Sequence, residues 1–414
     1  MGLEIENTNQ MNLLPLLTLR YDPTNIYVPT FRLRDVSVLD IVNSYTKKNS
    51  VSVRILENKI RSAIRREVDK FTQNKVCVAL SAGVDSNLIL CLLREEYPGL
   101  ELECINVSFD EKNEAVEAKN FAEEKGAGFQ QVYVENPLRD LPAMINIVKE
   151  PRWNIYQYYF IKKAKSISNL LFTGDGGDEI FAGYTFRYKK FLESFDRNAN
   201  SLERVQAYLS CHERDWVPDQ HEMFANELKF DWSSIYFLLN SYFSNDLNPL
   251  DQVLLADYNG KLMHDFVPSN DKYFRFFKLQ GLSPLLDNDV VEFGFDMPSE
   301  MKYSMEYNIG KLPLREILRI YAPDSDRKMN VKVGYGMDLV SLWNNTGRET
   351  VTMLLDNGRV FEDSLIDKNW YLRSLKRVDE NLDLRYISKL LQILSLEVWY
   401  RIFVTSEMNP LHHI

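Results

Sequence analysis

A short apolar run, followed by a small polar loop and a helix start, constrains the fold of this chain most. Residues 75–80 are rich in β-branched side chains and predict a buried strand. Residues 81–86 (Ser-Ala-Gly-Val-Asp-Ser) form the loop, and residues 86–97 predict a helix. Free backbone N–H groups and the positive end of a helix dipole converge on such a loop. The stretch therefore predicts a phosphate-binding turn, with an ordinary strand–turn–helix junction as the alternative.

The following hundred residues alternate between strand and helix patterns. We expect strands at 102–107, 129–134 and 170–172, and helices at 112–125, 138–148 and 154–167. This alternation predicts an α/β fold with a doubly wound parallel sheet and helices on both faces. Ligands of such sheets bind beyond the carboxyl ends of the strands. The loops that follow residues 80 and 172 both fall at that edge.

The rest of the chain shows no strand rhythm. A length of 414 residues favours two domains. We expect an N-terminal arm or small cap at 1–70, a nucleotide-binding α/β core at 71–195 and a mostly helical C-terminal part at 196–414. Residues 13–34 suggest short strands or an extended arm, and residues 51–71 an amphipathic helix. Amphipathic patterns predict further helices at 201–210, 232–243, 312–321 and 387–404.

Composition excludes several classes of partner. The formal net charge of −10 argues against nucleic acid or an anionic membrane surface as the main partner. The four cysteines form no Cys-x-x-Cys pattern and the five histidines no metal-ligand spacing, so we expect reduced thiols in a cytoplasmic protein. No apolar run reaches the roughly 18 residues that a membrane span needs.

A second loop, residues 173–184, combines carboxylates and glycines (Thr-Gly-Asp-Gly-Gly-Asp-Glu-Ile-Phe-Ala-Gly-Tyr). Asp175 and Asp178 would repel each other without a cation or a proton between them. The glycines would let the backbone approach something bulky. A helix start with Asp178 and Glu179 in its first turn explains only two of these residues. The loop is therefore the second half of the candidate site.

Residues 81–86 resemble the pyrophosphate loop of the ATP pyrophosphatases, and together with residues 173–184 they resemble the synthetase domain of the asparagine synthetase family. Residues 284–298 resemble its Pro-Phe-Leu-Asp segment. Residues 310–315 (Gly-Lys-Leu-Pro-Leu-Arg) resemble its Lys-x-x-Leu-Arg pattern, and residues 332–335 (Lys-Val-Gly-Tyr) its Lys-Gln-Gly-Phe pattern. The resemblance covers roughly residues 70–345 and implies a sheet of the adenine nucleotide alpha hydrolase-like type.

The resemblance also implies roles for matched residues. Asp85 and Asp178 would coordinate Mg²⁺, a hard cation that prefers carboxylate and phosphate oxygens. Asp175 stands where the family has the acidic residue linked to forming and using an acyl-adenylate. Lys332 matches the lysine that stabilises charge at the α-phosphate. The residues expected to bind the pyrophosphate and adenosine parts of ATP are Leu80, Ser81, Gly83, Asp85, Ser86, Val107, Thr173 and Gly174.

The implied reaction is the ATP-dependent amidation of a carboxylic acid. A carboxylate oxygen attacks the α-phosphorus of ATP, pyrophosphate leaves, and a nitrogen nucleophile then attacks the acyl-adenylate. Conversion of aspartate to asparagine, with release of AMP, is the leading expectation. The alternatives are a ligase or cyclase that joins another acid and amine, a tRNA-modifying ATP pyrophosphatase, and a non-catalytic partner that kept the fold.

Two departures from the family pattern bear on the substrates. Where asparagine synthetases carry Thr-Thr-x-Arg, residues 149–156 offer Arg152 as the only obvious partner for the carboxylate of a substrate. Family members that use glutamine begin with a cysteine nucleophile. In this chain, some 70 residues precede the first loop, and they contain no cysteine. We therefore expect the nitrogen to come from free ammonia, a separate ammonia-supplying subunit or an amine substrate. The sequence leaves the oligomeric state open, a homo-oligomer included.

Overall fold

The computed structural model describes residues 12–25, 37, 41, 52–109, 114–196, 198–323 and 337–414. Its strands form one five-stranded, wholly parallel sheet in the order β3-β2-β1-β4-β5. The order reverses between β1 and β4, which creates a topological switch point where such sheets bind ligands. The predicted parallel α/β fold is confirmed. The strands are β1 (Lys75–Ala79), β2 (Glu101–Ser108), β3 (Gly128–Tyr133), β4 (Leu170–Phe172) and β5 (Gln280–Leu282).

The central strand β1 is apolar because both of its faces are covered. The buried side chains of Val76 and Val78 belong to one hydrophobic core, whereas that of Cys77 belongs to a second core. Cys77 pairs with Leu171 of β4, and Val78 pairs with Cys104 of β2. A parallel strand between two helical layers needs such a continuous apolar run.

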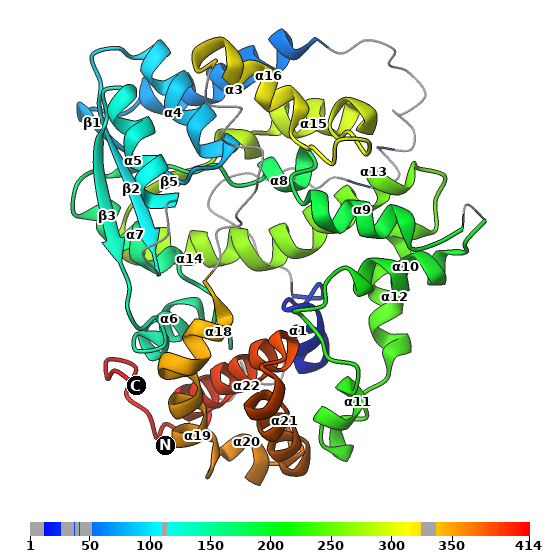
Figure 1. The fold of residues 1–414 in the computed structure, drawn as a ribbon. Helices are drawn as coiled ribbons and strands as arrows, with labels where there is room; N and C mark the ends of the chain where they lie inside the picture. Colours follow the sequence, from blue (N-terminus) through cyan, green and yellow to red (C-terminus); the bar gives the residue numbers. More distant parts are fainter. Residues whose placement is uncertain are drawn as a thin grey trace.

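The helices that cover the sheet agree with the predicted alternation (Figure 1). Helices α3 and α16 pack on α4, and α7 packs on β2 and β4. The helices of this part are α3 (Val53–Val68), α4 (Val84–Glu96), α5 (Glu114–Glu124), α6 (Leu141–Val148), α7 (Gln157–Lys165) and α16 (Leu312–Tyr321).

The second half of the chain is mostly helical, as predicted, and the four amphipathic stretches form α10, α12, α16 and α22. Within the described residues, no helix is long and apolar enough to span a membrane. The other main helices are α8 (Gly177–Ile180), α9 (Thr185–Glu193), α10 (Ser201–Ser210), α12 (Trp232–Phe243), α13 (Pro249–Ala256), α14 (Val267–Phe277), α15 (Asn288–Asp296), α19 (Arg348–Leu355), α21 (Lys368–Asn381) and α22 (Leu384–Phe403).

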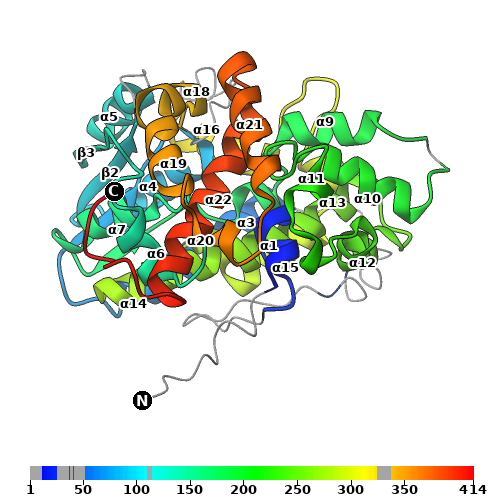
Figure 2. The same cartoon turned by 90° about the horizontal axis from the view of Figure 1, so that it is seen from below.

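Two expectations about local structure are wrong. Residues 13–19, expected in strands or an extended arm, form helix α1 (Leu13–Leu19), which lies against α22 in both views (Figures 1 and 2). Strand β5 belongs to the half for which no strand was expected, because three residues are too few for a periodic signal. The division of the chain at residues 70 and 195 stays a prediction.

Candidate active site

The first loop is folded onto the N-terminus of α4 by its own two serines. The hydroxyl oxygen of Ser86 accepts a hydrogen bond from the backbone N–H of Ser81 at 3.1 Å. The hydroxyl oxygen of Ser81 accepts one from the N–H of Gly83, also at 3.1 Å. Gly83 caps α4 with extended backbone. The loop therefore places small polar groups beside the helix start, where backbone N–H groups have no partner within the helix.

The second loop approaches the first so closely that several of its positions require glycine. A Cβ on Gly174 would lie 2.8 Å from the Cβ of Asp85, and one on Gly177 would lie 2.4 Å from Asp85 Oδ1. Gly176 has a φ of 91°, which side chains other than glycine rarely adopt. The bulky group for which Gly174 and Gly177 make room is therefore the Asp85 side chain of the first loop.

Lys311, at the start of α16, joins the two loops electrostatically. Its Nζ lies 2.8 Å from Asp178 Oδ1 and also forms an ion pair with Asp85 Oδ2. The backbone N–H of Lys311 donates to the carbonyl of Phe181 at 2.8 Å, which fixes α16 against the second loop. Burial alone would lower the pKa of Lys311, but Asp178 and Asp85 outweigh burial and raise it. Asp85 and Asp178 thus converge on a single positive charge.

The convergence of two carboxylates on one cation fits the donor set of a magnesium site. Mg²⁺ takes one or two protein carboxylates and completes its shell with phosphate and water oxygens. Among the residues that the structure describes, no group of three or more His, Cys, Asp or Glu side chains is arranged to hold a metal. Asp85 and Asp178 would therefore need oxygens from a bound nucleotide to complete the coordination of Mg²⁺.

Asp175 is held by contacts from three directions. Its Oδ2 accepts hydrogen bonds from the Thr173 hydroxyl at 2.8 Å and from Asn270 Nδ2 at 2.9 Å. The hydroxyl of Ser283, after β5, donates to the backbone carbonyl of Asp175 at 2.6 Å. Burial raises the pKa of Asp175, as do the charges of Asp85 and Asp178, against the effect of the two hydrogen bonds. The Asp175 carboxyl is thus fixed in place, with a raised affinity for a proton.

Glu179 adds a further acidic group to this region. Its side chain is buried and accepts a hydrogen bond from the Tyr184 hydroxyl at 2.6 Å. Burial, with the charge of neighbouring Asp178, raises the pKa of Glu179 to about 7. The two loops therefore gather acidic groups, of which Asp85 and Asp178 are paired with Lys311.

Leu80 and Val107 lie at the carboxyl ends of β1 and β2, as expected. The N–H of Leu80 donates to the Ile105 carbonyl at 2.9 Å, and the Leu80 carbonyl accepts from Asn106 Nδ2 at 2.8 Å. Val107 is buried and paired with Val132 of β3. Contact of Leu80 and Val107 with adenosine stays a prediction.

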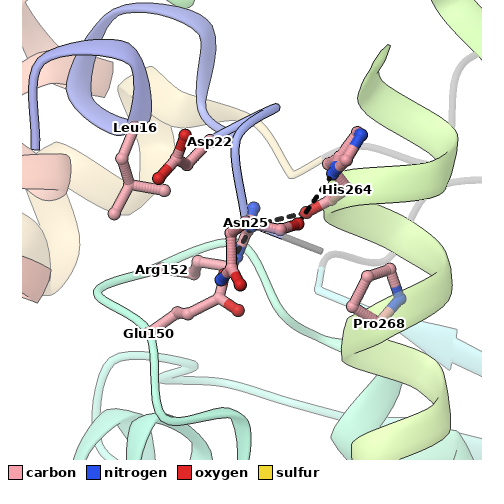
Figure 3. Close-up of a pocket in the computed structure, with 7 residues that line it drawn as sticks. All are labelled: Leu16, Asp22, Asn25, Glu150, Arg152, His264 and Pro268. Atoms are coloured by element: carbon pink, nitrogen blue, oxygen red, sulfur yellow. Dashed lines mark hydrogen bonds and ion pairs between the residues drawn. The ribbon is translucent and has the colours of Figure 1, made fainter. Parts of the chain in front are cut away.

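Arg152 lies in a different environment from the one expected. It lines a small cavity together with Asn25 and His264 (Figure 3). Its guanidinium donates to Glu150 at 2.7 Å and to the backbone carbonyls of Arg20 and His264 at 2.6 and 2.9 Å. It also forms an ion pair with Asp265 at 2.6 Å.

Protein groups thus occupy the donors of Arg152, and the residue is 4% exposed. These contacts could not be foreseen, because three of the four partners are more than 100 positions away in the sequence. These contacts give Arg152 a structural role between α1, α14 and the π-helix η3 (Asp257–Phe266), which precedes α14. Its role with a substrate carboxylate stays a prediction without a contact to support it.

Lys332 lies outside the described residues, so its predicted role at the α-phosphate is not tested. Three further residues of the site, Lys311, Asn270 and Ser283, were not among the predicted site residues. Lys311 lies in the stretch that resembles Lys-x-x-Leu-Arg, a signal to which sequence reasoning attached no function. Asn270 and Ser283 carried no signal, since their value depends on contact with Asp175 across the fold.

A comparison with protein-family models matches the chain to asparagine synthase over residues 56–401. The chain belongs to the asparagine synthase family. Among curated proteins it is similar to "Asparagine synthetase [glutamine-hydrolyzing] 1" of Bacillus subtilis (strain 168), with 24% identity over 410 residues. That alignment covers 89% of this chain and 63% of the relative, so the chain spans under two thirds of the relative's length.

Among solved structures, the chain is similar to the U34-tRNA thiolase NcsA from Methanococcus maripaludis with its [4Fe-4S] cluster. The match has 17% identity and a TM-score of 0.24, and covers 56% of this chain and 81% of that one. A likeness this distant contributes nothing to the functional argument. Membership of the asparagine synthase family indicates a ligase-type enzyme that uses ATP.

Proposed function

We propose that this chain activates a carboxylic acid with ATP, releases pyrophosphate, and transfers the acyl group from AMP to a nitrogen nucleophile. The observation that carries the proposal is the convergence of Asp85 and Asp178 on one cation beside the switch point between β1 and β4. Conversion of aspartate to asparagine is the leading reaction, because the family and the curated relative are asparagine synthetases.

The first loop is suited to bind the phosphates of ATP. The proposed ligands are the hydroxyls of Ser81 and Ser86 and the backbone N–H groups at the start of α4. Mg²⁺, held by Asp85 and Asp178 together with phosphate oxygens, would neutralise phosphate charge. Lys311 would contribute a second positive charge for departing pyrophosphate, and Lys332 would act at the α-phosphate.

The second loop is suited to the transfer step. Asp175 would accept a proton from the attacking nitrogen, since burial and neighbouring charge raise its pKa. Thr173 and Gly174 would line the nucleotide, Gly174 through a backbone already in contact with the first loop. A carboxylate that accepts a proton is needed for amidation and has no task in simple nucleotide binding.

A second candidate function is the ligation of an acid other than aspartate. One observation favours it: the donors of Arg152, the expected partner of a substrate carboxylate, are committed to protein groups. Family membership favours both ligase functions over that of a tRNA-modifying pyrophosphatase. The ion pairs of Lys311 with Asp85 and Asp178 favour a ligase over a non-catalytic partner.

The proposal extends to the nitrogen source and to the compartment. We propose ammonia, free or from a separate subunit, or a primary amine as the nitrogen donor. The four cysteines are unpaired, which suits the proposed reducing compartment, the cytoplasm.

Exchange of labelled pyrophosphate into ATP tests the proposal. With Mg²⁺ and a panel of carboxylic acids, we expect exchange that depends on an acid, and an Asp85→Asn variant should lose it. Exchange with aspartate supports asparagine synthesis, and exchange only with other acids supports the second candidate. Absence of exchange with every acid, with and without tRNA, would contradict both ligase readings.

A further inference from the structure

Asn270 has a side-chain amide whose two ends lie in different surroundings. Its Nδ2 donates to Asp175 Oδ2 at 2.9 Å. Its Oδ1 is buried and has no hydrogen-bond partner in the part of the chain that the structure describes. The residue is 4% exposed, so bulk water does not reach this oxygen freely. A buried acceptor without a donor costs free energy, and natural proteins keep few of them.

The orientation of this amide follows from the chemistry of Asp175. An ionised carboxylate only accepts hydrogen bonds, so Asn270 must turn its NH₂ group toward Asp175 and its oxygen away. Asp175 Oδ2 already accepts from the Thr173 hydroxyl at 2.8 Å. A proton on Asp175 would therefore sit on Oδ1, and the orientation of Asn270 is the same in either protonation state.

Asp175 Oδ1 is the second acceptor left open. Both hydrogen bonds to the carboxyl end on Oδ2, and none reaches Oδ1 from the described residues. Amide dimensions place Asn270 Oδ1 within about 5 Å of Asp175 Oδ2. Asp175 Oδ1 belongs to the same carboxyl group, so the two open acceptors, one neutral and one acidic, lie within about 7 Å of each other beside the two loops.

We propose that Asn270 Oδ1 and Asp175 Oδ1 together bind the nitrogen nucleophile through two of its N–H groups. This inference rests on the proposed function and extends it to the class of nucleophile: ammonia or a primary amine. Asn270 holds one N–H and orients the lone pair, while Asp175 holds the N–H whose proton it will receive.

The transfer step balances with these groups. The nitrogen lone pair forms a bond to the acyl carbon of the adenylate. The bond between that carbon and the phosphate oxygen breaks, and its electron pair leaves with AMP. The proton lost by nitrogen passes to Asp175 Oδ1. Asn270 exchanges no proton, so its contribution is to binding and orientation of the nitrogen donor.

Two matched variants separate this role from simple support of Asp175. Asn270→Leu and Thr173→Val each remove one hydrogen bond to Asp175 Oδ2, but only Asn270→Leu also removes the open acceptor. We expect the KM for ammonia to rise about tenfold more in Asn270→Leu than in Thr173→Val. Pyrophosphate exchange without ammonia should differ by no more than about threefold between the two variants.

The outcomes are distinguishable. Equal KM values for ammonia in the two variants, while the unmodified protein keeps acid-dependent exchange, would overturn the role of Asn270 and leave the proposed function standing. Loss of acid-dependent exchange in the unmodified protein would overturn the proposed function and this inference with it. Thermal unfolding of both variants shows whether they are folded when assayed.

A measurement on the unmodified protein keeps the inference testable if Asn270→Leu does not fold. Methylamine offers two N–H groups and dimethylamine only one. At equal concentrations of the neutral amines, kcat/KM for dimethylamine should be at least about tenfold below that for methylamine. Equal values, or higher values for dimethylamine, would contradict binding through two N–H groups.

Discussion

The carboxylate of Asp178 lies 2.8 Å from the Nζ of Lys311, and the same ammonium is paired with Asp85. This contact joins the loop after β1, the loop after β4 and the start of α16. It brings together two acidic side chains that are 93 positions apart in the sequence. Removing the ammonium would leave those two carboxylates close together without its positive charge between them.

The Lys311→Met variant should therefore lose both stability and activity. Without added metal, we expect its free energy of unfolding to fall by about 3 kcal/mol, as when one partner of a buried ion pair is removed. Mg²⁺ should restore more stability to the variant than to the unmodified protein, since it can take the place of the ammonium. Pyrophosphate exchange should fall about 100-fold.

Chemical denaturation with and without Mg²⁺, together with the exchange assay, measures these effects. Glu316→Gln, an exposed change on the same helix, is the control and should behave like the unmodified protein. An unchanged rate of pyrophosphate exchange in Lys311→Met would show that Lys311 does not act on the phosphates.

Gly174→Ala tests whether the two loops must touch. The added Cβ would lie 2.8 Å from the Cβ of Asp85 and 3.0 Å from the backbone nitrogen of Ser86, so the loops must separate. We expect a loss of about 1–3 kcal/mol in stability and a drop of about tenfold or more in exchange. Gly99→Ala is the matched control, because its Cβ would meet nothing within 4 Å. Equal exchange rates in the two variants would argue against close contact of the loops.

Lys389→Met tests how α1 is attached to α22. The buried ammonium of Lys389 donates to the carbonyl of Leu17, to the carbonyl of Asp215 at 2.7 Å and to Gln392 Oε1 at 2.6 Å. Methionine fills the space but removes the donor of two buried acceptors, the Asp215 carbonyl and Gln392 Oε1, while the Leu17 carbonyl keeps the hydrogen bond from Gln220 Nε2 at 3.1 Å. We expect a loss of about 2–4 kcal/mol in the free energy of unfolding. Denaturant unfolding measures it, with the exposed Lys376→Met expected to change stability by less than about 0.5 kcal/mol.

Glu150→Gln tests the network around Arg152 through pH. Burial alone would raise the pKa of Glu150, but Arg152 and Lys272 outweigh it and lower the pKa to about 2, from 4.5 in an unfolded chain. Ionised Glu150 therefore stabilises the fold above pH 4.5, and this contribution is lost as the pH falls from about 4.5 to about 2.

The advantage of the unmodified protein over Glu150→Gln should thus be roughly 3 kcal/mol at neutral pH and shrink steadily in acid. Denaturant unfolding at several pH values between 7 and 3 measures it. Glu117→Gln, an exposed change on α5, should show no such trend. A pH-independent difference would mean that Glu150 is not held in its ionised form.

Most of the sheet could be predicted because local pattern decides it. The apolar run of β1 indicates a strand, and the glycine-rich segment after β4 indicates a turn, each within a few residues. The five-strand sheet still needed β5, whose three residues become a strand only by pairing with Leu170–Phe172. Helix α1 escaped prediction for a related reason, since its burial depends on α22, some 370 residues away.

In the candidate site, too, the residues marked by local pattern could be predicted and those brought in by the fold could not. Asp85, Asp175 and Asp178 could be named because a distinctive local pattern surrounds each of them. The partner of Asp85 and Asp178, Lys311, and the partner of Asp175, Asn270, are brought to them by the fold from distant positions. Arg152 shows the converse: its residue type suits a substrate carboxylate, but Glu150 and Asp265 have already neutralised it.

Transfer of a labelled oxygen from the acid to AMP tests the central claim most directly. The acid that supports pyrophosphate exchange is prepared with heavy oxygen in its carboxyl group and incubated with ATP, Mg²⁺ and ammonia. If the carboxylate attacks the α-phosphorus, mass spectrometry will find one labelled oxygen in AMP and none in pyrophosphate. Label in inorganic phosphate with formation of ADP, or AMP without label, would contradict the acyl-adenylate route.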